Sequence, residues 1–235
     1  MITVDFNRLD IKSGDRILDI GCGTGRHTCE IFTRGAVAVG VDKCFEYLQK
    51  TRDTLVFWEE HGHEKGMWGI LSGDITQLPF ADNFFDLVIC SEVLEHIKDS
   101  RKAMAEIVRV LKPGKDLVVS VPRFFPECVC WALSKSYYQA EGGHVRIYKE
   151  KELINELESE GVQKWAKHFA HSLHTPYWWL KCLLGPNRDD LTMVNLYHRL
   201  LVWDIMHQPW LTKFSDKILN PVLGKSLVLY LRKEK

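Results

Sequence analysis

Residues 16–25 read Arg16-Ile17-Leu18-Asp19-Ile20-Gly21-Cys22-Gly23-Thr24-Gly25, and this stretch decides the fold of the chain. The apolar run that ends at Ile20 is typical of a strand covered on both faces. The three glycines after it allow the backbone to approach a ligand where a Cβ atom would clash. The helix that follows directs its free N–H groups toward that ligand. This join of strand, glycine turn and helix predicts a nucleotide-type cofactor site.

Asp19 distinguishes the two kinds of cofactor that such a turn can hold. A dinucleotide fold places a pyrophosphate at the helix N-terminus and gains nothing from a carboxylate beside that anion, whereas a cationic ligand is attracted by one. The glycines are also spaced G-x-G-x-G rather than G-x-G-x-x-G. Residues 19–25 resemble the first motif, D-x-G-x-G-x-G, of class I S-adenosylmethionine-dependent methyltransferases.

The resemblance implies a fold, a cofactor and a set of binding residues. The fold is α/β, a Rossmann-like doubly wound sheet that is mostly parallel, with an antiparallel last strand and helices on both faces. The cofactor is S-adenosyl-L-methionine and its product is S-adenosyl-L-homocysteine. The predicted cofactor-binding residues are Asp19, Gly21, Cys22, Gly23, Gly25, Asp42, Lys43, Asp74, Ile75, Ser91 and Glu92.

Two of the acidic candidates follow predicted strands on the first side of the sheet. Asp42 ends the strand over 36–41, about 20 residues beyond the first glycine, where a carboxylate accepts hydrogen bonds from both ribose hydroxyls. Its alternative role is a helix N-cap. In the resembled family the residues after the third strand bond the adenine amino group and pack on its ring. Asp74 and Ile75 match that description.

Ser91 and Glu92 follow the strand over 87–90, at the rim where open α/β sheets place their ligands. Glu95 and His96 come next, and in the resembled family an E-H-I at this place is often structural. Three further segments also resemble the family. They are residues 78–86, of the form L-P-F-x-D-x-x-F-D; 111–114, L-K-P-G, a predicted turn before a strand at 116–121; and 142–148, which hold a G-H-x-R-x-Y pattern.

His144 lies in the last of these segments and is the predicted catalytic residue. The pattern resembles methyltransferases of the ubiquinone and menaquinone type, in which this histidine faces the site, and an imidazole that orders the loop is the alternative. A base is needed only if the acceptor is an acidic carbon, a hydroxyl or an ammonium group. The other groups near the rim that could serve are His96, Glu92, His171 and Tyr148.

The composition limits the partners of the protein. A chain of 235 residues with 46% apolar residues can form one domain, 1–235. Lys+Arg and Asp+Glu both number 31, so no basic field favours nucleic acid. The N-terminus does not resemble a signal peptide and no apolar run reaches the roughly 18 residues of a membrane span, which predicts a cytoplasmic protein. The seven cysteines include no C-x-x-C pair, and His61 and His63 have no chelating neighbour, so no metal is predicted.

Residues 171–225 depart most from the resembled family, which joins its last two strands more briefly. The segment holds four of the eight tryptophans and two predicted helices, one from Leu191 to Pro209 and one through Phe214. We expect residues 171–225 to form one of three structures: a lid over an apolar acceptor, a surface that docks on the inner face of a membrane, or a packing or dimer contact. The oligomeric state stays open.

These patterns predict methyl transfer to a small-molecule acceptor, apolar or lipid-like, by in-line displacement. Positioning of the two reactants can contribute about 7 to 11 kcal/mol to such a step. One alternative is a regulator or assembly subunit that binds the cofactor without catalysis, which would form no S-adenosylhomocysteine. The other is an NAD-dependent oxidoreductase or epimerase, which Asp19 and the lack of a Tyr-x-x-x-Lys pair near the fifth strand disfavour.

Overall fold

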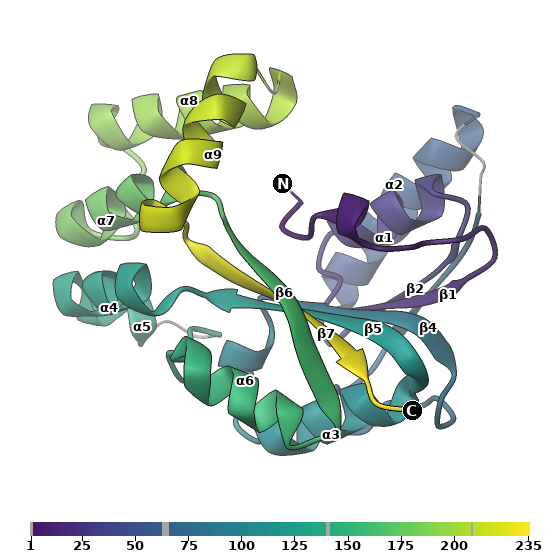
Figure 1. Ribbon diagram of the computed structural model, residues 1–235. Coiled ribbons are helices and arrows are strands. Elements are labelled where there is room, and N and C mark those ends of the chain that lie inside the picture. The colour runs from purple at the N-terminus through teal and green to yellow at the C-terminus, as the bar shows by residue number, and fades with distance from the viewer. Residues whose placement is uncertain (1, 63–65, 140–141, 208) are drawn as a thin grey trace.

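The computed structural model describes residues 2–62, 66–139, 142–207 and 209–235, and within these ranges the chain forms one seven-stranded sheet (Figure 1). The strand order is β3-β2-β1-β4-β5-β7-β6, and β7 alone runs antiparallel to its neighbours β5 and β6. The strands are β1 Arg16–Ile20, β2 Val37–Asp42, β3 Met67–Ser72, β4 Phe85–Ser91, β5 Leu111–Pro122, β6 Val162–Ala170 and β7 Ser226–Lys233. The predicted fold class is confirmed.

The helices form three groups around this sheet (Figure 1). The pair α1 and α2 covers one face, α3 and α6 cover the other, and α4, α5, α7, α8 and α9 gather beyond the carboxyl end of β5. The helices are α1 Arg26–Thr33, α2 Phe45–Glu60, α3 Ser100–Val110, α4 Phe124–Leu133, α5 Lys135–Tyr138, α6 Glu150–Glu158, α7 His174–Leu184, α8 Thr192–His207 and α9 Trp210–Leu223, with short 3-10 turns η1 Phe6–Arg8 and η2 Leu94–His96. None of them within the described ranges combines the length and hydropathy that crossing a bilayer requires.

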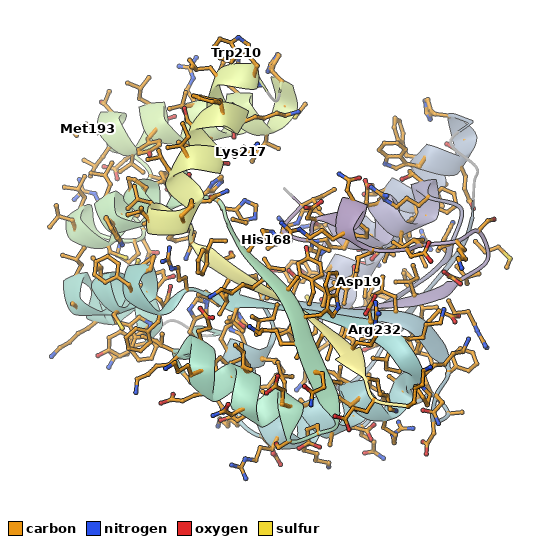
Figure 2. The ribbon with its side chains drawn as sticks, in the orientation of Figure 1. Asp19, His168, Met193, Trp210, Lys217 and Arg232 are labelled. Atoms are coloured by element: carbon orange, nitrogen blue, oxygen red, sulfur yellow. The ribbon has the colours of Figure 1, made fainter. Side chains whose placement is uncertain are left out.

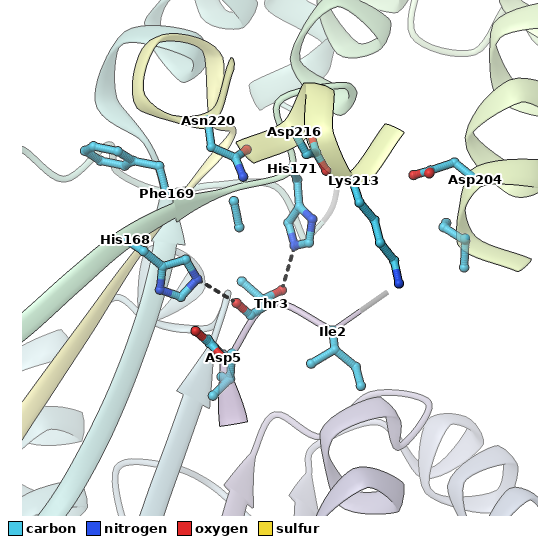
Figure 3. A pocket seen from close by; sticks show the side chains of 13 residues that line it. Ile2, Thr3, Asp5, His168, Phe169, His171, Asp204, Lys213, Asp216 and Asn220 are labelled. Carbon is cyan, nitrogen blue, oxygen red and sulfur yellow. Dashed lines mark hydrogen bonds between the residues drawn. The ribbon is translucent and has the colours of Figure 1, made fainter. Parts of the chain in front are cut away.

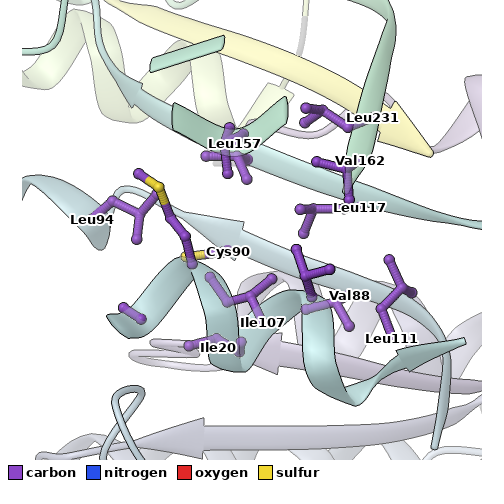
Figure 4. Close-up of a cluster of buried hydrophobic side chains, with 14 of the residues drawn as sticks. Ile20, Val88, Cys90, Leu94, Ile107, Leu111, Leu117, Leu157, Val162 and Leu231 are labelled. Carbon is purple, nitrogen blue, oxygen red and sulfur yellow. The ribbon is translucent and has the colours of Figure 1, made fainter. Parts of the chain in front are cut away.

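The sheet separates two apolar cores. Leu18 and Ile107 belong to the core beneath α3 and α6 (Figure 4), whereas Ile17 and Phe32 belong to the core beneath α1 and α2. Neighbouring residues of β1 therefore point to opposite faces, and both faces are buried. Burial on both faces is the physical reason why Ile17, Leu18 and Ile20 are all apolar.

The connections place the glycine turn at a topological switch point. From β1 the chain proceeds to β2 and β3 on one side, and then returns to place β4 on the other side of β1. Connections that leave neighbouring strands in opposite directions open a crevice at their carboxyl ends. The glycine turn after β1 and the residues after β4 lie at this crevice.

Two regions differ from the sequence prediction in detail. Residues 111–114 were predicted as a turn, but Leu111 already pairs with Phe85 at the start of β5. The register then shifts, so the residues that follow Leu111 form an irregular bulge in which Gly114 has φ +74°. Residues 124–139, which had no predicted secondary structure, form α4 and α5.

Candidate functional site

A cleft of about 800 Å³ opens at the carboxyl ends of β1, β2 and β4. Its volume is within the range of about 300 to 1,000 Å³ that is typical of small-molecule and cofactor sites. The predicted cofactor-binding residues that line it are Gly21, Gly23, Asp42, Lys43, Asp74, Ile75 and Glu92. Residues that lie far apart in the sequence thus meet in one hollow.

The glycine turn is held tightly at its first residue. Gly21 has φ +65°, and a Cβ atom there would lie 2.3 Å from Cγ2 of Val93. The Gly21 N–H donates to the carbonyl of Val41 over 2.7 Å, and the Thr51 hydroxyl donates to the carbonyl of Gly23 over 2.8 Å. The turn is therefore fixed between β2, α2 and the residues after β4, and only glycine fits at position 21.

The carboxylate of Asp42 supports the turn and retains capacity for a ligand. Its Oδ2 accepts the N–H of Gly23 over 2.8 Å, and its Oδ1 accepts the N–H of Cys44 over 2.8 Å. Each carboxylate oxygen has a second lone pair. Asp42 can therefore accept two more hydrogen bonds, which is what the two hydroxyls of a ribose require.

Asp74 and Ile75 form the opposite wall of the cleft. Oδ1 of Asp74 accepts the N–H and the hydroxyl of Thr76, both over 2.8 Å, and these bonds hold the pKa of Asp74 below its ordinary value. Asp74 is exposed and ionised, so it can accept a hydrogen bond from an amino group. Ile75 is buried and offers an apolar surface beside it.

Four predicted residues lie outside the walls of the cleft. Asp19 is buried behind the turn, where its Oδ2 accepts the Thr28 hydroxyl over 2.6 Å, and burial raises its pKa to about 7. Cys22 is also buried, Gly25 packs against α2, and the Ser91 hydroxyl bonds a neighbouring serine on β5. Direct contact of these residues with a cofactor stays a prediction.

A second cavity, of about 330 Å³, adjoins the cleft. Glu92, His96 and Gly142 line both spaces, so the two share a wall. The other residues that line the second cavity are Glu95, Tyr137, Gly143, His144, Trp178 and Lys225. Trp178 lies on α7, so residues 171–225, the segment that departs most from the resembled family, contribute to this cavity.

A buried carboxylate on α4 organises the second cavity. Glu127 is 1% exposed and its Oε1 lies 2.5 Å from Nδ1 of His144. Its Oε2 lies 3.5 Å from Nζ of Lys225, and its Oε1 also accepts the indole N–H of Trp131. Burial alone would raise the pKa of Glu127, but the bond to His144 and the charge of Lys225 hold it below its ordinary value. Glu127 is therefore ionised.

Two further carboxylates lie at the junction of the two spaces. Glu92 has φ +57°, an uncommon conformation for a residue with a side chain, and its Oε1 accepts the Ser120 hydroxyl over 2.8 Å. Glu95 is 1% exposed, and neither of its oxygens has a hydrogen-bond partner in the described part of the chain. Burial raises the pKa of both groups, and the charge of Glu92 raises that of Glu95 further.

Not all of the candidate bases meet in this cavity. Glu92, His96 and His144 line it, but Tyr148 is buried beside Arg146. His171 lies in another cavity, of about 460 Å³, between the N-terminal segment, β6 and α9 (Figure 3). There its Nε2 is 3.2 Å from the hydroxyl of Thr3. The prediction that His61 and His63 hold no metal lies partly outside the described residues, because residue 63 is not among them.

Two residues around His144 were missed by the sequence analysis: Glu127, which lies behind it, and Lys225, which lines the second cavity. Glu127 is the one charged residue in the apolar stretch 124–134, and a lone acid in such a stretch signals a buried partner. That signal could have found it. Lys225 carries no comparable signal, because it reaches Glu127 only through a contact between residues 98 positions apart.

Comparison with known proteins supports the sequence resemblance. A family model described as a methyltransferase domain matches residues 18–119. An uncharacterized methyltransferase of Schizosaccharomyces pombe is 30% identical over 176 residues, which make up 70% of this chain and 60% of that protein. A demethylmenaquinone methyltransferase of Corynebacterium kroppenstedtii is 37% identical over 112 residues, which make up 48% of this chain and 44% of that protein.

A solved structure supports the fold along the whole chain. A SAM-dependent methyltransferase from Methanosarcina mazei covers 100% of this chain and 99% of its own length, with a TM-score of 0.64 and 15% identity. The chain spans about half the length of the curated relatives it matches. The residues matched by the family model include the glycine turn, Asp42, Asp74 and Glu92.

Proposed function

We propose that this chain, whose residues 18–119 match a family model described as a methyltransferase domain, is a class I S-adenosylmethionine-dependent methyltransferase that transfers a methyl group to a small-molecule acceptor. The single observation that carries the proposal is that two neighbouring spaces share wall residues. Glu92 and His96 line both the cleft that holds Asp42 and Asp74 and the cavity that holds His144. A donor in the first space and an acceptor in the second would meet at these shared residues.

The cleft offers a partner for each part of the cofactor. Asp42 would accept the ribose hydroxyls, Asp74 would accept the adenine amino group, and Ile75 would pack on the adenine ring. Gly21 and Gly23 would leave room for the methionine end beside the start of α1. When bound, S-adenosylmethionine supplies a methyl group attached to a sulfonium cation.

We assign the contact with the acceptor to His144. The bond between its Nδ1 and Glu127 leaves Nε2 as the ring atom available to a ligand. The Glu127 carboxylate is buried and fixed, so it holds the imidazole in one orientation. An imidazole so placed is suited to taking a proton from a hydroxyl, an ammonium group or an acidic carbon.

We further propose one domain over 1–235, in which residues 171–225 form a lid that admits an apolar or lipid-like acceptor. Trp178 of this segment and Tyr137 of α5 line the second cavity, and their rings lie 5.7 Å apart between centroids. Trp179 donates its indole N–H to the carbonyl of Pro126, which attaches α7 to α4. Aromatic walls of this kind favour an acceptor with an apolar ring or chain.

The outer side of this lid suits a membrane surface. Trp210 is 77% exposed and, like Met193, points away from the body of the molecule (Figure 2). Other apolar side chains exposed on α8 and α9 are those of Leu196, Met206, Leu211, Phe214, Ile218 and Val222. Lys213 and Lys217 lie on the same helix as Trp210. Tryptophan and lysine around an apolar face are typical of interfacial helices, so we propose a cytoplasmic protein that contacts the inner membrane face through this lid.

The test uses methyl-labelled S-adenosylmethionine and a fractionated cell extract, with Asp42→Asn as the matched control. We expect label in the lipid fraction together with S-adenosylhomocysteine, and neither with the variant. Label in the aqueous fraction alone would contradict a lipid-like acceptor. Absence of S-adenosylhomocysteine with every fraction would contradict methyl transfer and favour a cofactor-binding protein without catalysis.

A further inference from the structure

We propose that Glu95, His96 and His144 together bind a divalent transition-metal ion in the wall of the second cavity. One donor atom of each residue lies within 4.8 Å of the others. The inference rests on the proposed function and changes the role of one residue in it, because Nε2 of His144 would bind the ion and the ion would contact the acceptor. It departs from the sequence prediction of no metal, which considered only residues close in sequence.

Glu95 is the first argument for a cation. Its side chain is 1% exposed, and both carboxylate oxygens are buried without a hydrogen-bond partner among the described residues. A buried carboxylate in this position is costly unless a proton or a cation accompanies it. Glu92 lies close enough to add a second negative charge to the same region.

Each of the two histidines has one ring nitrogen that is free to bind an ion. Nδ1 of His96 lies 3.3 Å from the carbonyl oxygen of Gly143, which can only accept, so Nδ1 carries the proton. Nδ1 of His144 donates to the ionised Glu127. In both rings Nε2 therefore holds a free lone pair. A histidine whose other nitrogen donates to a carbonyl or carboxylate is the usual arrangement of a metal ligand.

The distances permit coordination after a small closure. Nε2 of His96 lies 3.9 Å from Oε1 of Glu95. Ligand atoms around an ion with bonds of about 2.0 to 2.2 Å are about 3 to 3.5 Å apart, so atoms that lie as much as 4.8 Å apart need to approach by less than about 2 Å. Two imidazoles and one carboxylate are a ligand set of Zn²⁺ and Fe²⁺ that leaves coordination positions open.

The charges around the three ligands also favour a dication. Lys225 lies 3.5 Å from Glu127 and offsets the charge of that carboxylate. A divalent ion would offset the charges of Glu92 and Glu95. Tyr137 and Trp178 line the same cavity, so an acceptor bound against them would present its oxygen to the open positions of the ion. A divalent ion would acidify a hydroxyl bound to it, which points to a hydroxyl as the methyl-accepting group. Its proton would pass to the carboxylate of Glu92, which lines the same cavity, and its oxygen would bond the methyl carbon as the bond from that carbon to sulfur breaks.

The test is a calorimetric titration with Zn²⁺ alone. We expect one bound ion per wild-type chain and at least 100-fold weaker binding by Glu95→Gln, which loses a ligand. Glu127→Gln should bind 10- to 100-fold more weakly, because it changes the carboxylate that accepts the Nδ1 proton of His144. His198→Asn, on the exposed part of α8, should bind as the wild type does. Equal affinity of the wild type and Glu95→Gln, or absence of binding, would overturn the proposal. Binding of choline, an organic cation that cannot be coordinated as a metal is, without binding of Zn²⁺ would overturn the proposal as well.

Two further measurements separate this proposal from failures of folding or of the proposed function. Without metal, Glu95→Gln should melt at or above the wild-type temperature, because it removes a buried carboxylate, and Zn²⁺ should raise the melting temperature of the wild type alone. EDTA should abolish S-adenosylhomocysteine formation and Zn²⁺ should restore it. Undiminished turnover in EDTA would overturn the role of the ion. If no turnover occurs under any condition, the proposed function fails, whereas the titration still decides the metal site.

Discussion

His144 and Glu127 lie 2.5 Å apart, measured from Nδ1 of the imidazole to Oε1 of the carboxylate. The pair connects the loop before α6 to α4, and the same carboxylate contacts Lys225 just before β7. Three parts of the chain that are distant in sequence are thereby fixed around one imidazole. This pair orients His144 toward the space where an acceptor would bind.

His144→Ala should lower turnover by about 100-fold or more, because it removes the group that acts on the acceptor. The affinity for S-adenosylmethionine should stay nearly unchanged, since His144 does not line the cofactor cleft. Steady-state kinetics and a cofactor titration on the same preparation check both expectations. Glu127→Gln should give a smaller loss of turnover. Full turnover in His144→Ala would remove this residue from the mechanism.

Gly21→Ala should abolish measurable cofactor binding. The new methyl group would lie 2.3 Å from Cγ2 of Val93 and would sit on a residue with φ +65°, so the turn must move. The control is Gly14→Ala, which has φ +84° but no atom within 4 Å of the new methyl group. That variant should lose about 1 kcal/mol of stability and bind the cofactor normally. Adding Val93→Ala to Gly21→Ala should restore part of the affinity, and equal binding by Gly21→Ala and Gly14→Ala would contradict the geometry of the turn.

Acidification should destabilise the protein through His27. This side chain is 6% exposed, its Nε2 accepts the N–H of Thr3, and burial lowers its pKa to about 3. The unfolded chain binds a proton at His27 below its ordinary pKa, whereas the folded chain does not until about pH 3. The stability from a neutral His27 is therefore present above pH 6.5 and lost as the pH falls toward 3.

From pH 7.5 to pH 5.5 this single group should lower the free energy of unfolding by about 1.4 kcal/mol. Urea unfolding at the two pH values measures the change. His27→Gln should reduce the difference between the two pH values by about that amount. His207→Gln, at an exposed position at the end of α8, should leave the difference as in the wild type. An unaltered pH dependence in His27→Gln would show that His27 is not the source.

Substituting both Trp210 and Phe214 by serine should weaken binding to anionic vesicles by more than tenfold. Each aromatic side chain contributes about 1.5 to 3 kcal/mol when it leaves water, and both are more than half exposed in the structure. Co-sedimentation with phosphatidylglycerol vesicles is the measurement. Phe57→Ser, at an exposed aromatic on α2, is the matched control and should bind as the wild type does. Equal sedimentation of all three proteins would contradict a membrane role for α9.

Much of the fold could be predicted because its strands lie between two helical layers. The run 87–90 is wholly apolar, and the run 17–20 is interrupted by Asp19 alone, which is buried. The helices between strands keep regular spacing and end signals. The departure at 111–114 has a physical reason. Proline and glycine suggested a turn, but pairing of Leu111 with Phe85 places the bulge inside a strand.

Whether a residue of the candidate site could be predicted depends on how far away in the sequence its partners lie. Asp42, Asp74 and Glu92 could be located because each follows a strand, and the sheet brings strand ends together. Asp19 was selected on a different ground, its charge beside the glycine turn. Its side chain accepts the Thr28 hydroxyl, and its contact with a cofactor stays a prediction. The partners of His144 depend on packing between α4 and the residue before β7, which no local pattern encodes.

The most direct test of the cofactor assignment is a calorimetric titration of S-adenosylmethionine into the wild type and into Asp42→Asn. We expect one bound S-adenosylmethionine per wild-type chain and at least tenfold weaker binding by Asp42→Asn. The variant replaces the carboxylate that would accept the ribose hydroxyls by a neutral amide, which accepts hydrogen bonds less strongly. Titration of NAD into the wild type should give no binding. Tight binding of NAD with none of S-adenosylmethionine would contradict the account.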